Sequence, residues 1–234
     1  MSSADGSFED QDTAAIARWF DELYARRERY WWRGEGRYAL RPDAYPDSLL
    51  TQQTLRLTER HLNRSRRRVL DLGAGEGADA IRMALLGYRV TAVEVSGIGV
   101  AKIRRFADEA NISLEIVQAD MNTYQPAGKF DVILCNGVLQ YIQHKKPVIE
   151  RMQEATRPGG INVISVWSTH SELPPSHRAV PAFCDNEDGV VTGLYSHWKT
   201  EFLYFDRNKP ETAHPTIDQH VHSHIKLIAR KPRR

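Results

Sequence analysis

The sequence is poor in cysteine, in long apolar runs and in signals for export. Its two cysteines, Cys135 and Cys184, form no disulfide framework, so we expect a protein of the reducing cytoplasm. No stretch approaches the roughly 18 apolar residues of a membrane span. Residues 1–7 lack the basic and apolar regions of a signal peptide, so we expect no membrane partner.

Charge of one sign is also scarce, because the formal net charge is only +2 over 234 residues. Global electrostatics therefore give no support for a nucleic-acid partner. The basic run Arg64 to Arg68 precedes a predicted strand. We interpret it as a solvated connection between a helix and that strand rather than as a binding patch.

The order of predicted elements indicates an α/β fold. From residue 68 onward, strand patterns alternate with helical patterns, which favours a mostly parallel sheet with helices on both faces. The final strands, 201–205 and 222–230, indicate an antiparallel edge hairpin. We predict a helical segment at residues 1–62 and a globular domain at 63–234. The other predicted strands are 69–72, 89–95, 114–120, 130–136 and 161–166, and the predicted helices are 12–31, 47–61, 78–86, 97–110, one that ends near 155, and 189–198.

The central motif is the glycine-rich turn of residues 69–77, between a strand and a helix. Its glycines remove the Cβ atoms that would keep a ligand off the backbone, and the next helix begins with exposed amides. The pattern fits a dinucleotide site and equally the D-x-G-x-G-x-G turn of S-adenosylmethionine (SAM) enzymes. Asp71 favours SAM, because its carboxylate would repel a pyrophosphate and attract the ammonium of a methionine moiety. A turn without a ligand is the alternative.

Acidic residues end three consecutive predicted strands: Asp71, Glu94 and Asp120. Glu94 follows the turn by about 20 residues, the spacing at which a carboxylate accepts both ribose hydroxyls. Asp120 lies at the next strand end and can accept a hydrogen bond from an adenine amino group. Each acid could instead cap the helix that follows it. Three acids at successive strand ends favour a nucleoside site.

The strand ends and turns also form a set of motifs. The segments are 69–77, 90–94, 120–122 and 130–134. Together they resemble the successive motifs of class I SAM-dependent methyltransferases. Segments 37–42, 152–162 and 228–231 are similar to the tellurite-resistance branch of that superfamily. The resemblance spans roughly residues 37 to 232.

This resemblance implies a Rossmann-like, seven-stranded and mostly parallel sheet with an antiparallel final hairpin, and SAM as cofactor. It implies that two glycines of the turn face the methionine part of SAM, that Glu94 holds the ribose and that Asn136 lies near the methionine end. The residues after β-strands two and three should flank the adenine. The implied cofactor-binding residues are Asp71, Gly73, Gly75, Glu94, Val95, Asp120, Met121 and Asn136.

The sequence departs from the tellurite-resistance branch on its last hairpin. In that branch a histidine followed by an arginine, with a second arginine, is thought to act at the substrate. His214 matches the histidine, but Pro215 stands where the arginine would be. Capture of an oxyanion is therefore disfavoured, because arginine suits bidentate anion binding and neutral histidine does not.

Histidines 220, 222 and 224 alternate, so on a strand they share one face. This spacing could bind a metal. A polar hairpin surface is the favoured interpretation, and we predict no metal. A histidine with a pKa near 6.5 can take the proton of an O–H or N–H nucleophile. We therefore predict His214 and His222 as the candidate bases or substrate anchors.

Two segments are candidates for shaping an acceptor pocket. Aromatic residues gather just before the Gly34-Glu-Gly36 break, as in a mobile N-terminal lid over an active site, although plain core packing is an equal alternative. The long connection 168–188 leaves the carboxyl end of a strand, where parallel sheets bind ligands. The candidate substrate-binding residues are Tyr30, Trp31, Trp32, Arg41 and His170.

We therefore expect a small-molecule methyltransferase, monomeric or homodimeric, that acts on an organic O, N or C nucleophile, for example in natural-product tailoring. A tellurite- or chalcogen-detoxifying methyltransferase and a non-catalytic SAM-binding regulatory protein are the alternatives. A nucleic-acid or protein acceptor is disfavoured. The sequence after predicted strand four, Asn136-Gly-Val-Leu139, is not a base-methylation motif of the Asn-Pro-Pro-Tyr type.

Overall fold

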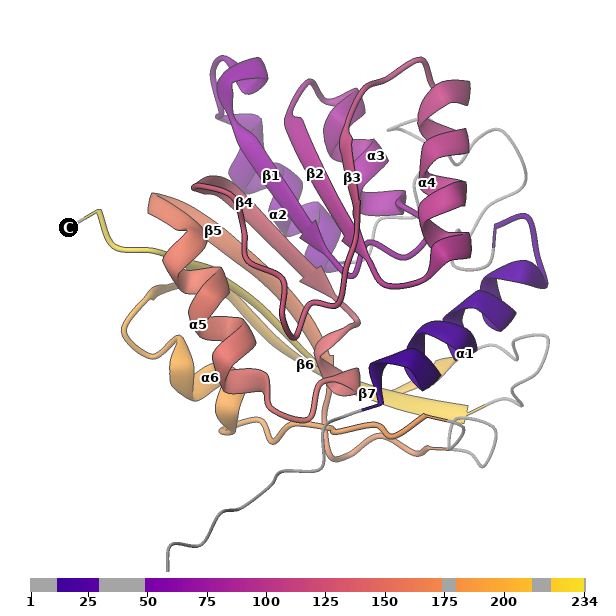
Figure 1. Ribbon diagram of the computed structural model, residues 1–234. Coiled ribbons are helices and arrows are strands. Elements are labelled where there is room, and N and C mark those ends of the chain that lie inside the picture. The colour runs from indigo at the N-terminus through magenta and orange to yellow at the C-terminus, as the bar shows by residue number, and fades with distance from the viewer. Residues whose placement is uncertain (1–11, 30–48, 174–179, 212–219, 234) are drawn as a thin grey trace, which may run out of the picture.

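The fold is built on one seven-stranded sheet of order β3-β2-β1-β4-β5-β7-β6 (Figure 1). The computed structural model describes residues 12–29, 49–173, 180–211 and 220–233. Neighbours among β1 to β5 run parallel, and β7 runs antiparallel between β5 and β6. The predicted class, sheet and final hairpin are confirmed. The strands are β1 (Arg68–Leu72), β2 (Arg89–Glu94), β3 (Glu115–Gln118), β4 (Phe130–Asn136), β5 (Thr156–Trp167), β6 (Lys199–Glu211) and β7 (His220–Arg230).

Helices cover both faces of the sheet. Successive strand residues point to opposite faces, so Leu70 packs on one side and Val69 on the other. Helices α5 and α6 cover the first face with residues such as Ile149 and Val191, and α2, α3 and α4 cover the second. Within the described ranges, no helix has the length and apolarity needed to cross a membrane. The helices are α1 (Thr13–Ala25), α2 (Leu49–Glu59), α3 (Ala78–Leu85), α4 (Gly97–Glu109), α5 (Lys145–Ala155) and α6 (Val190–Leu194), with short 3-10 turns η2 (Arg64–Arg66) and η3 (Leu139–Tyr141).

Helix α1 is shorter than the sequence predicts. Asp12 caps it as expected, through a hydrogen bond from a first-turn amide. The helix ends at Ala25 rather than continuing to residue 31. On either side of that end, Lys102 Nζ donates to the carbonyl oxygens of Tyr24 and Arg27, each at 2.6 Å. The helix therefore ends where Lys102, a residue distant in sequence, binds these backbone carbonyls.

Strand β5 starts earlier than predicted, at Thr156. The predicted turn at 157–160 stays in the sheet because it pairs with the chain beyond β7. Gly159 N donates to Lys231 O at 3.0 Å, and Lys231 N donates to Gly160 O at 2.9 Å. Gly159 has a φ of 78°, and the register against β4 shifts at this point. Glycine thus allows an irregular strand where the Pro-Gly-Gly sequence suggested a turn.

The segment after β4 also differs from the prediction, which placed one helix there. It forms two elements, the short turn η3 and then helix α5. Helix α6 is shorter than the predicted helix at 189–198, and β6 begins directly after that region at Lys199. The consequence is that η3 lies at the carboxyl end of β4, beside the glycine-rich turn.

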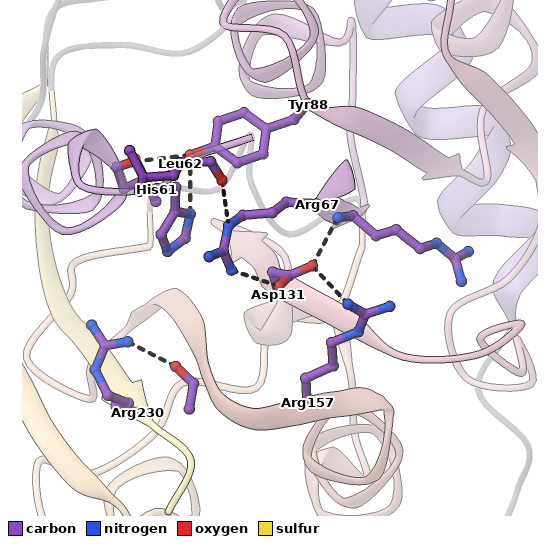
Figure 2. A network of polar contacts seen from close by, with 10 residues as sticks. His61, Leu62, Arg67, Tyr88, Asp131, Arg157 and Arg230 are labelled. Carbon is purple, nitrogen blue, oxygen red and sulfur yellow. Dashed lines mark hydrogen bonds and ion pairs between the residues drawn. The ribbon is translucent and has the colours of Figure 1, made fainter. Parts of the chain in front are cut away.

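A polar network closes the opposite, amino edge of the sheet (Figure 2). The Asp131 carboxylate accepts hydrogen bonds from Arg67 Nη1 and Arg68 N, both at 2.9 Å, and lies 3.6 Å from the guanidinium of Arg157. Nearby, the His61 ring and the Tyr88 hydroxyl are 3.1 Å apart. Burial, and next the Arg67 guanidinium, lower the pKa of His61. Asp131 is therefore the anion that joins β1, β4 and β5 at this edge.

Cations at the same edge also bind the carboxyl ends of helices. Lys129 Nζ donates to Glu154 O at 2.6 Å, at the end of α5, and Arg64 Nη2 donates to Glu59 O at 3.3 Å, at the end of α2. Helix carboxyl ends carry a partial negative charge, which these side chains neutralise. The basic run at 64–68 thus makes intramolecular contacts at a connection between a helix and a strand.

We expect Asp131→Ala to lower the free energy of unfolding by about 2 kcal/mol, because it removes the partner of Arg67 and of a part-buried backbone amide. Urea unfolding measures this change. The control is Glu150→Ala, which removes one end of an exposed pair with Lys146 at 3.9 Å and should cost under about 0.5 kcal/mol. Equal losses in the two variants would contradict the role assigned to Asp131.

Candidate active site

The glycine-rich turn follows β1 and adopts backbone angles that favour glycine. Gly73, Gly75 and Gly77 have φ values of 71°, 59° and 87°. A Cβ at Gly73 would lie only 2.5 Å from Val138 Cγ2, so this turn and the segment after β4 are in direct contact. The amide of Gly73 donates to Val93 O at 2.8 Å, which ties the turn to β2. A Cβ at Gly75 would meet the Tyr24 hydroxyl at 3.0 Å, and one at Gly77 would meet Ile103 at 2.8 Å. The glycines therefore allow α1, α4 and the segment after β4 to pack closely on the turn.

Glu94 links the end of β2 to the glycine-rich turn. Its Oε2 accepts from Gly75 N at 2.8 Å, and its Oε1 accepts from Ser96 N at 2.9 Å. The side chain is buried, and this burial raises the pKa of Glu94 to about 7 in spite of the two hydrogen bonds. Each carboxylate oxygen has a second lone pair, so Glu94 can still accept hydrogen bonds from two hydroxyl groups.

Asp71 lies beneath the turn and is also buried. Its Oδ2 has no hydrogen-bond partner within the described part of the chain. Burial raises the pKa of Asp71 well above its ordinary value, and the charges of Asp79 and Glu94 raise it further, against a hydrogen bond from the Ala80 amide. A cationic ligand beside Asp71 would offset both its burial and the negative charges of Asp79 and Glu94. The unsatisfied Oδ2 therefore fits the ammonium group of a methionine moiety.

Asp120 and Asn136 complete the row at this edge. Asp120 Oδ1 accepts from Asn122 N at 2.8 Å, and its Oδ2 accepts from the Thr13 hydroxyl of α1 at 2.7 Å. Asn136 is exposed at the end of β4, where its Nδ2 donates to Asp79 Oδ2 at 3.2 Å. Val95 is half-buried and Met121 is buried. The structure thus brings the predicted cofactor-binding residues to one edge of the sheet.

Helix α1 lies across this edge, beside the ends of β2 and β3 and the start of α4 (Figure 1). Asp21 Oδ1 accepts from Ser96 Oγ at 2.5 Å and from Ile98 N at 3.0 Å. Lys102 of α4 donates to Glu76 Oε1 of the turn at 2.6 Å, in addition to its contacts with the carbonyls of Tyr24 in α1 and of Arg27 just beyond it. Polar contacts therefore hold α1 at its start, middle and end. Sequence reasoning missed Asp21, Glu76 and Lys102, because their pairing gives no local pattern.

Aromatic rings continue from α1 along the other half of the carboxyl edge. Ring centroids are 5.2 Å apart for Phe20 and Tyr141, 5.6 Å for Tyr141 and Trp167, and 4.2 Å for Trp167 and His222. The His222 and His224 rings follow at 5.9 Å, so these two share one face as predicted. The chain of rings joins α1, η3, the end of β5 and β7.

For the remaining predicted site residues, the structure gives fewer contacts or none. His170 is exposed, on a segment whose neighbour Ser171 exchanges hydrogen bonds with Ser223 of β7. The side chain of His220 is not among those described. Over the described residues, no group of three or more histidine, cysteine or acidic side chains is arranged to hold a metal ion. Outside the described residues lie Tyr30, Trp31, Trp32, Arg41 and His214.

The strand order, the antiparallel β7, the left-handed glycines after β1 and the acids after β1, β2 and β3 together define the class I SAM-dependent methyltransferase fold and its cofactor edge. The chain belongs to this family, since a family model described as a methyltransferase domain matches residues 63–210. SAM is the cofactor of the family.

Relatives at low identity lie within the same superfamily. The chain is 27% identical over 146 residues to the probable SAM-dependent methyltransferase TehB of Haemophilus influenzae, a match that covers 62% of this chain and 49% of TehB. It is 25% identical over 137 residues to a ubiquinone biosynthesis O-methyltransferase of Rickettsia akari, over 58% of this chain and 54% of that protein. The chain thus spans about half the length of the curated relatives it matches.

Solved structures agree on the fold. The crystal structure of TehB from Haemophilus influenzae superposes with a TM-score of 0.66 at 20% identity, over 81% of this chain and 65% of that one. Magnesium protoporphyrin IX methyltransferase from Synechocystis PCC 6803, solved with bound SAM, superposes with a TM-score of 0.64 at 16% identity, over 94% and 97% of the two chains. The shared architecture therefore extends beyond the segment matched by sequence.

We expect the stability of the ligand-free protein to fall as pH rises from about 4.5 to 7. Folded Glu94 keeps its proton up to a pKa of about 7, whereas the ordinary value is 4.5, so unfolding releases a proton between these limits. This difference corresponds to ~3 kcal/mol of stability lost by neutral pH. Urea unfolding at a series of pH values measures the slope.

The slope should become shallower in Glu94→Gln, which cannot titrate at this position, while the contribution of the buried Asp71 remains. It should persist in Asp188→Asn, which changes an exposed carboxyl of the 168–189 segment. Parallel pH profiles for Glu94→Gln and the unchanged protein would exclude Glu94 as the source.

We expect Asp21→Ala to loosen α1 from the carboxyl edge, because Ser96 Oγ and Ile98 N lose their shared acceptor. A charge-assisted contact of ~1.5 kcal/mol corresponds to roughly 10-fold faster opening, read as hydrogen exchange of the α1 amides. Glu22→Ala, at the exposed neighbouring acid, is the matched control and should leave exchange unchanged. If both variants exchange alike, Asp21 does not anchor the helix.

Proposed function

We propose that this chain transfers the methyl group of SAM to a small organic molecule through an O, N or C nucleophile. The observation that carries the proposal is the row of acids and left-handed glycines at the carboxyl edge. Asp71 has an unsatisfied Oδ2 suited to the methionine ammonium, and Glu94 is placed for the ribose hydroxyls. Asp120 at the next strand end suits the adenine amino group. No other described part of the chain gathers such groups.

Family membership and the character of the acceptor side support a small-molecule substrate. The similar protein from Rickettsia akari is named as a ubiquinone biosynthesis O-methyltransferase, a function in small-molecule metabolism. The chain of aromatic rings from Phe20 to His222 lies at the same edge and would form the wall of the acceptor side. Apolar and aromatic walls with few polar groups are typical of small-ligand sites.

The chemistry is an in-line displacement at an activated carbon. SAM supplies a methyl group on a positively charged sulfur, so the protein mainly aligns the two reactants and excludes water. Glu94 and Asp71 would fix the cofactor ends on either side of the transferred group. His222 packs against Trp167 with the two rings tilted by 34°, and it is the described candidate for holding the acceptor or taking its proton.

Helix α1 would act as a lid over this site. Thr13 donates to the Asp120 oxygen that an adenine amino group would use, so the start of α1 must shift or share this acceptor when the cofactor binds. The contacts of Asp21 and Lys102 hold the rest of the helix on α4. Closing of α1 over the bound pair would exclude water from the reacting groups.

A chalcogen-detoxifying methyltransferase is the second candidate, supported by the similarity to TehB in sequence and in fold. The replacement of the expected arginine by Pro215 argues against binding of an oxyanion. Volatile methylated tellurium produced from tellurite by the purified protein would favour this candidate, and its absence would count against it.

We expect SAM at 100 times its Kd to stabilise the protein by about 2.7 kcal/mol, which raises the Tm by roughly 5–10 °C. NAD at the same concentration should leave the Tm unchanged, and stabilisation by NAD alone would overturn the proposal. Glu94→Ala should lose the SAM-dependent shift, because the ribose and the glycine-rich turn both lose an acceptor. Asp188→Ala should retain it. SAM binding without methyl transfer to any fraction of a small-molecule extract would instead favour a regulatory protein.

A further inference from the structure

Gln140 lies between the cofactor edge and the chain of aromatic rings. It is the middle residue of η3, which is separated from the end of β4 by two residues. Two positions before it, Val138 touches the glycine-rich turn at Gly73. One position after it, Tyr141 contacts the rings of Phe20 and Trp167. Gln140 therefore belongs to the segment that would separate a bound cofactor from a bound acceptor.

The amide of Gln140 is held in one orientation and leaves an unused acceptor. Its Nε2 donates to Gly137 O at 2.7 Å, and its backbone oxygen accepts from Phe183 N at 2.6 Å. The residue is only 2% exposed, yet Oε1 has no hydrogen-bond partner among the described residues. An unsatisfied buried acceptor costs about 1–3 kcal/mol, so its presence calls for a ligand or a water molecule.

Neighbouring donors of the chain are directed elsewhere. Lys145 Nζ donates to Ile142 O at 3.2 Å and lies 6.0 Å from the centre of the Phe183 ring. Asn136 Nδ2 donates to Asp79. Among the described residues no donor is left for Oε1, and we infer that a bound molecule, the proposed methyl acceptor, supplies it.

We propose that Gln140 Oε1 accepts a hydrogen bond from the nucleophilic O–H or N–H group of the methyl acceptor, and that the acceptor is a neutral ring compound such as a phenol. This inference rests on the proposed function and names its substrate class. An amide oxygen only accepts hydrogen bonds, so it selects a group that carries a proton. A carboxylate or an oxyanion offers none, and its charge would also approach Asp71 and Asp79. The aromatic residues beside Gln140 offer ring faces and edges for stacking.

In this arrangement the hydrogen bond orients a lone pair of the acceptor oxygen or nitrogen toward the methyl carbon. The acceptor forms the new bond to that carbon with its lone pair, and the bond from carbon to sulfur breaks with its electrons on sulfur. Once the new bond has formed, the methylated atom carries the positive charge; its proton then leaves the hydrogen bond with Oε1 and passes to a base, for which His222 is the candidate, and on to solvent. Gln140 stays neutral throughout, so it positions the nucleophile and takes no proton.

The kinetic test uses Gln140→Met, which keeps the size of the side chain and removes Oε1. The unchanged protein is incubated with labelled SAM and a small-molecule extract, and the labelled product is identified. We expect a methyl ether or a methylated nitrogen on a ring compound. With that acceptor, Gln140→Met should lose about 10-fold in kcat/KM, while the Kd for SAM in calorimetry changes less than about twofold. The matched control, Gln143→Met, changes an exposed glutamine nearby and should keep full activity.

A methyl ester as product, or full activity of Gln140→Met, would overturn the inference and leave the proposed function intact. No transfer to any fraction would overturn both. A crystal structure of the protein with S-adenosylhomocysteine and the identified acceptor gives an independent readout. A donor of the acceptor within hydrogen-bond reach of Oε1 supports the inference. A donor from this chain, or a water molecule that remains when the acceptor is bound, overturns it.

Discussion

The direction shared by parallel strands is the constraint on which the rest of this structure depends. Because β1 to β5 run the same way, the helices between them begin at one edge of the sheet and end at the other. Positive helix ends therefore gather at the carboxyl edge, where Asp21 meets the first amides of α4. Negative helix ends gather at the amino edge, where Lys129 and Arg64 bind the last carbonyls of α5 and α2. The topology thus decides which charge each edge can use to bind helix ends.

The same constraint explains why the carboxyl edge is costly to build without a ligand. Asp71 and Glu94 are buried beside one another's charge, and one of them has an unsatisfied oxygen. Removing a carboxylate from water without a partner is unfavourable, and burial accordingly raises the pKa of both groups. A cation at Asp71 and two hydroxyl donors at Glu94 would stabilise the ionised carboxylates. The buried acids at the carboxyl edge thus lower the stability of the ligand-free protein and provide the groups that would bind a ligand.

Local patterns in the sequence predicted much of the fold because the residues that specify it are adjacent in the chain. The apolar strands, the glycines of the turn and the acid at each strand end lie in short segments, and the boundaries of β4 were predicted without error. The candidate cofactor-binding residues could be predicted because they lie within these short segments. The docking of α1 could not be predicted, because Asp21 and Lys102 find partners about 75 residues away. Gln140 gave no signal either, since its unused oxygen depends on how η3 packs, in a region where a helix was expected.

The position of β7 in the sheet has a consequence for how the protein is made. This strand is the last in the sequence, but it lies between β5 and β6 and supplies buried residues such as Ile225 and Ile228 to both faces. While the chain is still being synthesised, β5 has an open edge and β6 has no strand to pair with. The nascent sheet would expose an unpaired edge of β5 until β7 has emerged from the ribosome. Only then can β7 pair with β5 and β6 and complete the sheet.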